Sequence, residues 1–507
     1  MTITNQSANS YAYSDVLIVG AGLSGIGAAY RIQEQNPDLS YTILERRARV
    51  GGTWDLFQYP GVRSDSDIFT LSFPWRPWTR SETIARGSDI RAYIADSAHE
   101  HGIDRHIEFD TTMLAANWDW TCDTWTVTAR RDGRDRHYRC RFIFFGTGYY
   151  SYDRPYTPNL PGAESFCGTI IHPQHWPEGF DYSGKRVVVV GNGATAVSMI
   201  PTLTETAGDV TLLQRSPGYV VSQREHNSIN NAIRAALPSR AAHAVVRWWN
   251  VALGTSTFAF ARKAPKLTRR WVRRLAKAQL PAHFDVDTHF NPKYDPWDQR
   301  VCVSLDGDLY TTIRQGRLNV VTDHIERLDA SGIVLRSGTH LDADVIVTAT
   351  GFQLELLGAV KVSIGDQQIK PHEHWSYKTH LLNDVPNLAW CIGYTNVSWT
   401  LRADTTARYV AKLLAYMDSH RYTHAYPHLE NADAMATRPA FDLRSGYVLR
   451  SPNVLPKSGD REPWQVRQNF LLDMLAFRLN RIDECMVFGR VDDRPHIPQA
   501  MRERSES

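Results

Sequence analysis

The stretch Asp15-Val-Leu-Ile-Val19, followed by Gly20-Ala-Gly22-Leu-Ser-Gly25, decides the fold of this chain. The residues before the first glycine are mostly apolar and suit a strand that is buried on both faces. Small and apolar residues then recur with helical spacing through Ile32. Gly20 permits a tight turn, Gly22 lets backbone N–H groups approach a pyrophosphate, and Gly25 allows the helix to pack closely on the strand.

An acidic residue follows the next predicted strand. The run Tyr41-Thr-Ile-Leu44 ends in Glu45, 20 residues after Gly25. A carboxylate at this position can hydrogen-bond ribose hydroxyls. A glycine-rich turn alone is weak evidence, but strand, helix and acid together predict a dinucleotide site. Because the carboxylate would repel a 2′-phosphate, this site favours FAD or NAD over NADP.

The same pattern recurs later with a different ending. Arg186-Val-Val-Val-Val190 runs into Gly191-Asn192-Gly193-Ala194-Thr195-Ala196, and the next predicted strand, 209–213, ends in Gln214-Arg215-Ser216. A guanidinium and a hydroxyl there suit a 2′-phosphate, which predicts NADPH; the alternative for Arg215 is a solvated surface charge. A chain that binds both FAD and NADPH is expected to pass a hydride between them.

Length and composition exclude several classes of protein. The 507 residues predict two or three domains, and 42% apolar with 22% charged residues is typical of a soluble globular protein. The net charge of +3 gives no argument for nucleic-acid binding. No apolar run of about 18 residues predicts a spanning helix, and residues 1–11 lack a signal-peptide pattern, so we expect a cytoplasmic enzyme. The six cysteines are scattered, which predicts neither a metal site nor a redox pair.

The order of these patterns predicts an α/β protein with two Rossmann-like dinucleotide-binding domains and a helical insertion in the second. Strands at 142–145 and 344–350 end in Thr-Gly and mark where the chain crosses between domains. We expect the FAD domain at 1–148 and 343–507, and the NADPH domain at 149–221 and 293–342. The helical insertion is expected at 222–292, with helices at 232–237, 241–253 and 265–280.

Two longer motifs indicate a family. Phe166-Cys-Gly168-Thr-Ile-Ile-His172-Pro-Gln-His-Trp176-Pro177 and the stretch from Gly51 to Asp65 resemble the motifs of Baeyer–Villiger monooxygenases, type I class B flavoproteins. The resemblance covers nearly the whole chain. Within the family it looks most like the ethionamide-activating enzymes of mycobacteria, at 51–73, 171–177, 291–309 and 393–404.

The resemblance assigns roles to individual positions. Arg300 matches the active-site arginine, and Asp65 matches the carboxylate that orients it; read from the residues alone, Asp65 could instead cap a helix that begins near Ser66. His172 and Trp176 match a linker between the nucleotide domains. Positions implied for FAD are Gly20, Gly22, Ser24, Gly25, Glu45, Gly52, Thr53, Trp54, Asp55, Asp65 and Met113. Positions implied for NADPH are Arg63, Ser64, Gly191, Asn192, Gly193, Ala194, Thr195, Ala196, Arg215 and Ser216.

One position departs from the family pattern. Many relatives carry lysine immediately before the active-site arginine, whereas this chain has Gln299. Recognition of a 2′-phosphate is then expected to depend more heavily on Arg215, with a weaker preference for NADPH over NADH.

The resemblance also implies a reaction. NADPH reduces FAD, O2 adds to give a C4a-peroxyflavin, and Arg300 stabilises the negative charge as a small hydrophobic ketone becomes an ester or lactone or a thioether becomes a sulfoxide. Three alternatives remain open. They are an S- or N-oxygenating flavin monooxygenase without Baeyer–Villiger activity, an NADPH oxidase or reductase, and a non-catalytic dinucleotide-binding protein associated with membranes.

Aromatic and basic residues suggest further surfaces. Phe69, Phe73, Trp75, Trp78, Tyr394 and Trp399 could line a substrate pocket or pack in the core, and loops 371–384 and 446–462 are expected to shape that pocket. In the insertion, the basic residues from Arg262 to Lys277 fall on one helical face and Leu267, Trp271 and Leu275 on another. This pattern is typical of a solvated surface helix; weak contact with an anionic membrane surface or nucleic acid is the alternative.

Overall fold

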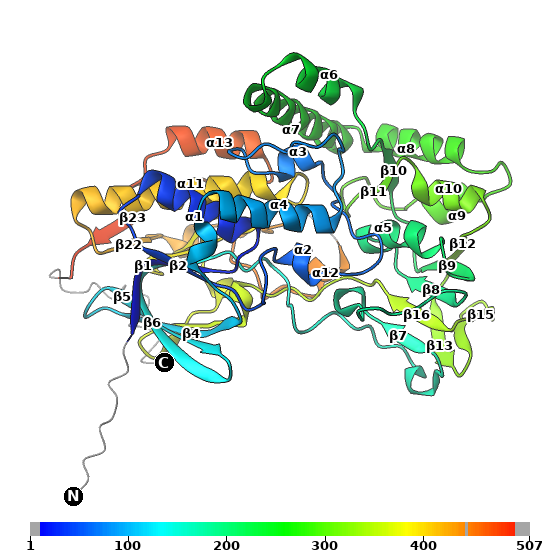
Figure 1. The fold of residues 1–507 in the computed structure, drawn as a ribbon, viewed down its shortest axis with the longest axis horizontal. Coiled ribbons are helices and arrows are strands. Elements are labelled where there is room, and N and C mark those ends of the chain that lie inside the picture. Colours follow the sequence, from blue (N-terminus) through cyan, green and yellow to red (C-terminus); the bar gives the residue numbers. More distant parts are fainter. Residues whose placement is uncertain (1–10, 442–444, 492–507) are drawn as a thin grey trace, which may run out of the picture.

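Two β-sheets lie side by side in the computed structural model, which describes residues 11–441 and 445–491 (Figure 1). We call the part around the first sheet the first lobe and the part around the second sheet the second lobe. The helices α6 (Ser228–Ala236) and α7 (Ser239–Lys263) lie above them in this view, and the short helices α2 (Thr53–Leu56) and α12 (Gly446–Leu449) lie between them.

The first sheet is built on the glycine-rich turn. Parallel strands run in the order β3 (Ile107–Glu108), β2 (Tyr41–Leu44), β1 (Ala12–Val19) and β6 (Arg134–Phe145). The sheet continues through β5 (Thr124–Arg131), β4 (Thr111–Asp119), β17 (Lys361–Ile364) and β18 (Gln367–Gln368). Off β6 it branches into β21 (Leu388–Trp390), β20 (Leu381–Leu382) and β19 (Ser376–Tyr377).

The predicted burial of β1 on both faces is confirmed. Ile18 packs under helices α1 (Leu23–Gln35) and α11 (Trp399–His420), whereas Leu17 and Val19 pack on the opposite side of the sheet with Trp118. Alternate side chains of one strand therefore enter two separate hydrophobic clusters. The helix α4 (Gly87–Glu100) joins the α1 side, and β22 (His424–Pro427) pairs with β23 (Met486–Gly489) near the end of the chain.

The second sheet repeats the arrangement. Its five parallel strands run β12 (Asn319–Thr322), β9 (Asp209–Gln214), β8 (Arg186–Val190), β16 (Val345–Thr348) and β7 (Thr169–Ile171). Helices α5 (Ala194–Leu203) and α10 (Asp308–Arg314) pack beside it. The small antiparallel sheet β13 (Ile325–Asp329), β14 (Gly332–Leu335) and β15 (His340–Asp342) covers the other side.

One expected domain boundary is displaced. The prediction assigned all of 343–507 to the FAD domain, but β16 pairs in parallel with both β8 and β7 and completes the second sheet. The physical reason is that its four buried residues fill the position between those strands, so the chain returns to the first lobe only after Thr348.

The predicted insertion is helical. It comprises α6 (Ser228–Ala236), α7 (Ser239–Lys263), α8 (Pro265–Gln279) and α9 (Val286–Phe290), so the helix expected at 241–253 is one 25-residue helix. Strands β10 (Val220–Gln223) and β11 (Cys302–Leu305) pair at its base. No helix in the described ranges is long and apolar enough to cross a membrane.

Candidate active site

A cavity of about 890 Å³ reaches both glycine-rich turns. Gly20 and Gly22 line one part of it, and Gly191 and Gly193 line another. Gly20 has a φ of +98° and Gly191 a φ of +114°, backbone conformations that side-chain-bearing residues rarely adopt. The structure thus brings the two predicted nucleotide turns into one continuous space.

Both helices that follow these turns begin without a side-chain cap. Helix α1 starts after Gly22 and α5 starts after Gly193; neither has a capping hydrogen bond or an acidic residue in its first turn. Their N–H groups and positive helix ends are free to bind phosphate oxygens. Gly25 has its predicted packing role, because a Cβ atom there would lie 1.8 Å from the Gly20 carbonyl oxygen.

Glu45 lies at the end of β2, beside the first turn. One carboxylate oxygen accepts a hydrogen bond from the Ala21 N–H at 2.7 Å, and the other accepts from the Arg47 N–H at 2.9 Å. Burial raises the pKa of this carboxyl. These bonds fix the side chain at the cavity wall, where the remaining lone pairs can accept from ribose hydroxyls.

Hydrogen bonds connect the second glycine-rich turn to the segment around Arg215, directly after β9. The Asn192 amide donates to Gln214 Oε1 and to the Ser216 carbonyl oxygen, both at 2.7 Å, which holds the segment carrying Arg215 against the turn. Arg215 is exposed and lines the cavity. A second cation, not predicted from the sequence, is Arg450; it follows α12 and also lines the cavity, with its guanidinium 3.5 Å from the Tyr156 ring centroid.

The two guanidinium groups are close enough to repel each other. Desolvation lowers the pKa of Arg450, and the charge of Arg215 lowers it further. An anion placed between them would relieve this repulsion. Arg63 adds a donor, because its Nη2 is buried without a partner among the described residues while its Nη1 donates to Asp308 at 2.6 Å.

Arg300 and Asp65 meet in the cavity although 235 positions separate them in the chain. Arg300 Nη1 donates to Asp65 Oδ2 at 2.5 Å, and 36% and 37% of the two side chains are accessible. Asp65 raises the pKa of Arg300, so the guanidinium stays charged. The capping role considered for Asp65 belongs instead to Asp67, which accepts from the N–H of Thr70 in α3 (Ile68–Leu71).

The helical insertion holds the loop that carries Arg300. Trp297 has a φ of +72°, a strained conformation for an aromatic residue. Its ring packs edge-on against Phe258 of α7 at 5.3 Å, and Arg262 forms a 2.8 Å ion pair with Asp298. These contacts stabilise the strained loop, so the insertion contributes to the position of the arginine.

Two tyrosines beside Arg300 were also missed. Tyr149 and Tyr447 line the cavity, and both phenol groups act on the pKa of Arg300. Tyr149 stacks on Trp399 at 5.2 Å. Tyr149 directly follows the Thr-Gly crossing at 147–148, a signal that could have found it, whereas nothing in loop 446–462 distinguishes Tyr447.

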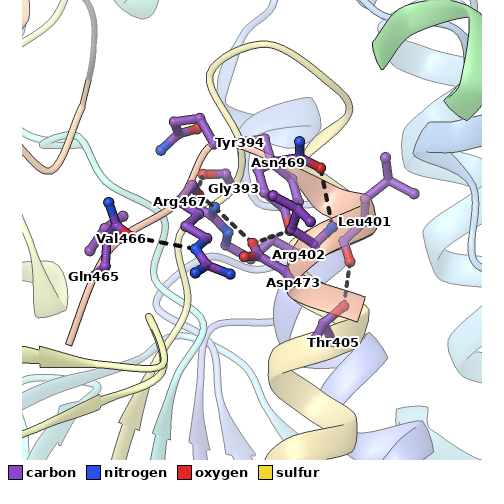
Figure 2. Close-up of polar contacts among 12 residues, drawn as sticks. Gly393, Tyr394, Leu401, Arg402, Thr405, Gln465, Val466, Arg467, Asn469 and Asp473 are labelled. Carbon is purple, nitrogen blue, oxygen red and sulfur yellow. Dashed lines mark hydrogen bonds and ion pairs between the residues drawn. The ribbon is translucent and has the colours of Figure 1, made fainter. Parts of the chain in front are cut away.

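A buried arginine braces another wall of the cavity. Figure 2 shows Arg402 of α11 between the loop at Gly393 and the segment before α13 (Phe470–Leu479). Its guanidinium donates to the carbonyl oxygens of Gly393 and Arg467 and to Asp473 at 3.2 Å. Tyr394 stacks beneath it at 3.7 Å and donates to Asp473 at 2.5 Å.

Further hydrogen bonds connect the segment before α13 to the cavity lining. Residues 394–397 line the cavity, and Gln468 Oε1 accepts hydrogen bonds from both the N–H and the hydroxyl of Thr395. Asn396 donates to the Gln468 carbonyl oxygen. The C-terminal segment therefore sets the shape of the wall formed by 394–397.

Most positions assigned from the sequence line this cavity. They are Gly20, Gly22, Ser24, Glu45, Gly52, Thr53, Trp54, Arg63, Ser64, Asp65, Met113, Gly191, Asn192, Gly193, Ala194, Thr195, Arg215, Ser216 and Arg300. Gly25, Asp55 and Ala196 lie beneath the lining, and Asp55 is bound by Arg47 at 2.6 Å and Arg49 at 3.0 Å.

Of the six aromatic residues that could line a pocket or pack in the core, two line the cavity and four pack in the core. Tyr394 and Trp399 line the cavity, but Phe69, Phe73, Trp75 and Trp78 pack in the hydrophobic cluster around α1 and α4. Phe73 and Trp75 stack on each other at 4.4 Å.

The linker motif lies outside the cavity. It supplies β7, and a Cβ atom on Gly168 would lie 2.4 Å from the Asp344 carbonyl oxygen. Burial lowers the pKa of His172 to about 4, and Trp176 packs edge-on against Phe180 and Tyr182. Phe166 packs on the small sheet of the second lobe.

Within the described part of the chain all six cysteines are free and no group of acidic, histidine or cysteine side chains could hold a metal.

Sequence comparison with known proteins identifies the family of this chain. Residues 83–412 match the family described as flavin-binding monooxygenase-like, and residues 18–80 match an NAD(P)-binding Rossmann-like domain. The FAD-containing monooxygenase EthA of Mycolicibacterium smegmatis is 45% identical over 471 residues, which cover 93% of this chain and 96% of that protein. The chain belongs to the flavin-binding monooxygenase-like family.

Solved structures share the two-lobed fold of this family member. The oxidized steroid monooxygenase bound to NADP superposes with a TM-score of 0.75 at 23% identity, over 94% of this chain and 100% of that one. The OTEMO complex with FAD and NADP gives 0.73 at 19% identity, over 95% and 100%. The predicted α/β architecture with two nucleotide-binding lobes is confirmed by these similarities.

Proposed function

We propose that this protein is an FAD- and NADPH-dependent monooxygenase of Baeyer–Villiger type, converting small hydrophobic ketones to esters or lactones and thioethers to sulfoxides. One observation carries the proposal: a single cavity contains two uncapped helix N-termini, a cationic pair at the second, and the Arg300–Asp65 ion pair. The relative EthA is named a FAD-containing monooxygenase, which supports the flavin.

FAD fits the first turn. Its pyrophosphate would bind the N-terminus of α1, and Glu45 would hold the adenosine ribose. A Cβ atom on Gly22 would lie 3.4 Å from the Gly52 Cα, so these glycines leave backbone, rather than side chains, at the cavity. Thr53 and Trp54, and the backbone at Met113, would complete the binding surface.

NADPH fits the second turn. Its pyrophosphate would bind the N-terminus of α5, while Arg215, Ser216 and Arg450 would take the 2′-phosphate. Arg450 compensates for the lysine that Gln299 replaces. Arg63 and Ser64 would add donors from the first lobe.

The chain supplies the charge that oxygen insertion needs. When bound, the flavin would take a hydride from NADPH and activate O2 for transfer to the substrate. Arg300 provides a fixed positive charge where negative charge develops on the substrate carbonyl oxygen. Asp65 positions the guanidinium, and because the pKa of Arg300 is raised it acts as a charge and hydrogen-bond donor rather than as an acid.

Apolar residues of the cavity lining support the proposed substrate class. Tyr394, Val397, Trp399 and Leu449 present mainly apolar surface to the cavity, which suits a small hydrophobic ketone or thioether.

Product analysis tests the proposal. Purified FAD-loaded protein is given NADPH, ¹⁸O2 and either cyclohexanone or methyl phenyl sulfide, and the products are analysed by mass spectrometry. We expect one labelled oxygen in the lactone and one in the sulfoxide. Labelled sulfoxide without lactone would assign the enzyme to S-oxygenation alone. Hydrogen peroxide in equal amount to the NADPH consumed, with neither product, would assign it to the oxidases.

A further inference from the structure

The helical insertion has an unusual charge distribution. Residues 226–284 contain no aspartate or glutamate but eleven lysines and arginines, whereas the whole chain has a net charge of only +3. Such an acid-free basic segment attracts anionic surfaces.

Helix α7 exposes an uncharged apolar stripe. Val245, Trp248, Trp249, Leu253 and Phe260 are each 43–53% exposed. At 100° per residue they fall within one continuous face that extends over 15 residues of helix, about 22 Å. Between Ala241 and Ala261 the only charged residue is Arg247, which is buried. Exposed apolar side chains that align over this length mark an interaction surface.

The inner side of α7 is firmly attached, so the stripe cannot turn inward. Arg247 donates to the carbonyl oxygens of Phe69, Thr70 and Ser72 at 2.7–3.1 Å. The ring of His243 contacts the Phe73 carbonyl oxygen at 3.2 Å. These contacts fix which face of the helix looks outward.

Helix α8 places cations beside a second apolar stripe. Leu267, Trp271 and Leu275 are 55%, 60% and 39% exposed, while Thr268, Val272 and Ala276 form the buried face. The predicted separation of basic and apolar faces is therefore correct, but the apolar triplet is exposed. The adjoining cations have no ion pair among the described residues; they are Lys263, Lys266, Arg270, Arg274 and Lys277.

A third stripe continues the surface. Leu471, Leu472, Leu475 and Leu479 of α13 are 41–72% exposed. Trp248 packs against Phe470 at 5.9 Å, which joins α13 to α7. In Figure 1, α13, α7, α6 and α8 occupy the same upper side of the molecule.

We propose that α7, α8 and α13 form a docking surface for an anionic lipid bilayer. Tryptophans and leucines would enter the boundary between headgroups and acyl chains, and the unpaired cations on α8 and at the end of α7 would contact anionic headgroups. The charge complementarity selects this occupant, since the cations adjoin the apolar stripe and no acid interrupts the segment. An apolar protein partner or a second copy of this chain would have no need of five unpaired cations.

Vesicle flotation of the FAD-loaded full chain tests the proposal. We expect binding to vesicles that contain phosphatidylglycerol, weak binding to phosphatidylcholine alone, and release at high salt. Because each cation near an anionic surface strengthens binding roughly fivefold, Arg270→Gln with Arg274→Gln should weaken it about 25-fold. Trp248→Ser with Trp249→Ser should abolish it.

Matched controls separate this surface from general cationic attraction. Arg134→Gln with Arg136→Gln removes two exposed cations from β6, on the lower side of Figure 1, and should leave vesicle binding unchanged. Thermal midpoint and bound flavin verify that each variant folds. Absence of vesicle binding, equal binding to both vesicle types, or binding retained in both test variants would overturn the proposal. So would a dimer, measured by sedimentation velocity, that the tryptophan substitutions dissociate.

Discussion

Replacement of Arg300 by alanine should separate flavin chemistry from oxygen insertion. The substitution removes a permanent charge whose observed ion-pair partner is Asp65 at 2.5 Å. Loss of one preorganised stabilising group in an active site lowers kcat by about 10²–10³, or roughly 3–4 kcal/mol. About a third of each side chain is accessible, so the pair contributes at most about 1 kcal/mol to folding.

Two further variants show how the loss in kcat divides between the charge of Arg300 and its position. Arg300→Lys keeps the charge but loses the planar fork of donors, so we expect a loss in kcat of about tenfold. Asp65→Asn keeps a hydrogen-bond acceptor but removes the charge that positions the guanidinium, and a similar loss is expected. A larger loss from Asp65→Asn than from Arg300→Ala would contradict the positioning role.

The assay measures three quantities on the same preparations. Anaerobic stopped-flow absorbance gives the rate of flavin reduction by NADPH, gas chromatography gives lactone and sulfoxide, and thermal unfolding gives stability. We expect reduction at the wild-type rate and a midpoint within a few degrees, while product falls several hundred-fold.

Arg130→Ala serves as the matched control. Arg130 pairs with Asp135 at 2.9 Å on the first sheet and lies outside the cavity lining. This variant should keep full activity. If Arg300→Ala formed product at the rate of the control, the electrostatic reasoning would be refuted; if it lost its flavin instead, Arg300 would be a structural residue.

Three other expectations follow from named contacts. Arg215→Leu and Arg450→Leu should each raise KM for NADPH about tenfold or more, the equivalent of one charge-assisted hydrogen bond, and leave KM for NADH unchanged in steady-state assays. Arg402→Leu removes the buried partner of Asp473 and should destabilise the protein by about 3 kcal/mol in denaturant titrations while raising KM for the substrate. Burial lowers the pKa of His243 to about 4, so above that pH the histidine is neutral in the folded protein. In the unfolded chain it gains a proton below about pH 6.5. The free energy of unfolding should therefore fall as the pH decreases from 6.5 to 4, and it should fall less in His243→Gln.

The fold could be predicted from residues that lie close together in the chain. The turn at Gly20–Gly25, Glu45 at the end of the next strand, and the repeat at Gly191–Ala196 each combine a strand, a turn and a helix within a few tens of residues. Backbone conformation at glycine and the alternation of apolar side chains act locally, so their pattern can be read before any tertiary contact is known.

The sequence could not place residues whose local pattern suits two different environments. Phe69, Phe73, Trp75 and Trp78 satisfy a core and a substrate wall equally well, and only the tertiary packing placed them in the core. The strand 345–348 would suit either sheet, and the gap between β7 and β8 decided its place.

The sequence by itself therefore predicted two glycine-rich nucleotide-binding turns and a helical insertion with a basic face, and its resemblance to a family singled out Arg300 and Asp65. Tertiary structure alone decided that Tyr447 and Arg450 enter the cavity, that Arg402 braces its wall, and that α7 turns an apolar face outward. The physical reason is the separation along the chain over which each kind of interaction acts. Backbone preferences depend on neighbouring residues, whereas a cavity is formed by side chains hundreds of positions apart, whose meeting depends on the packing of the whole chain.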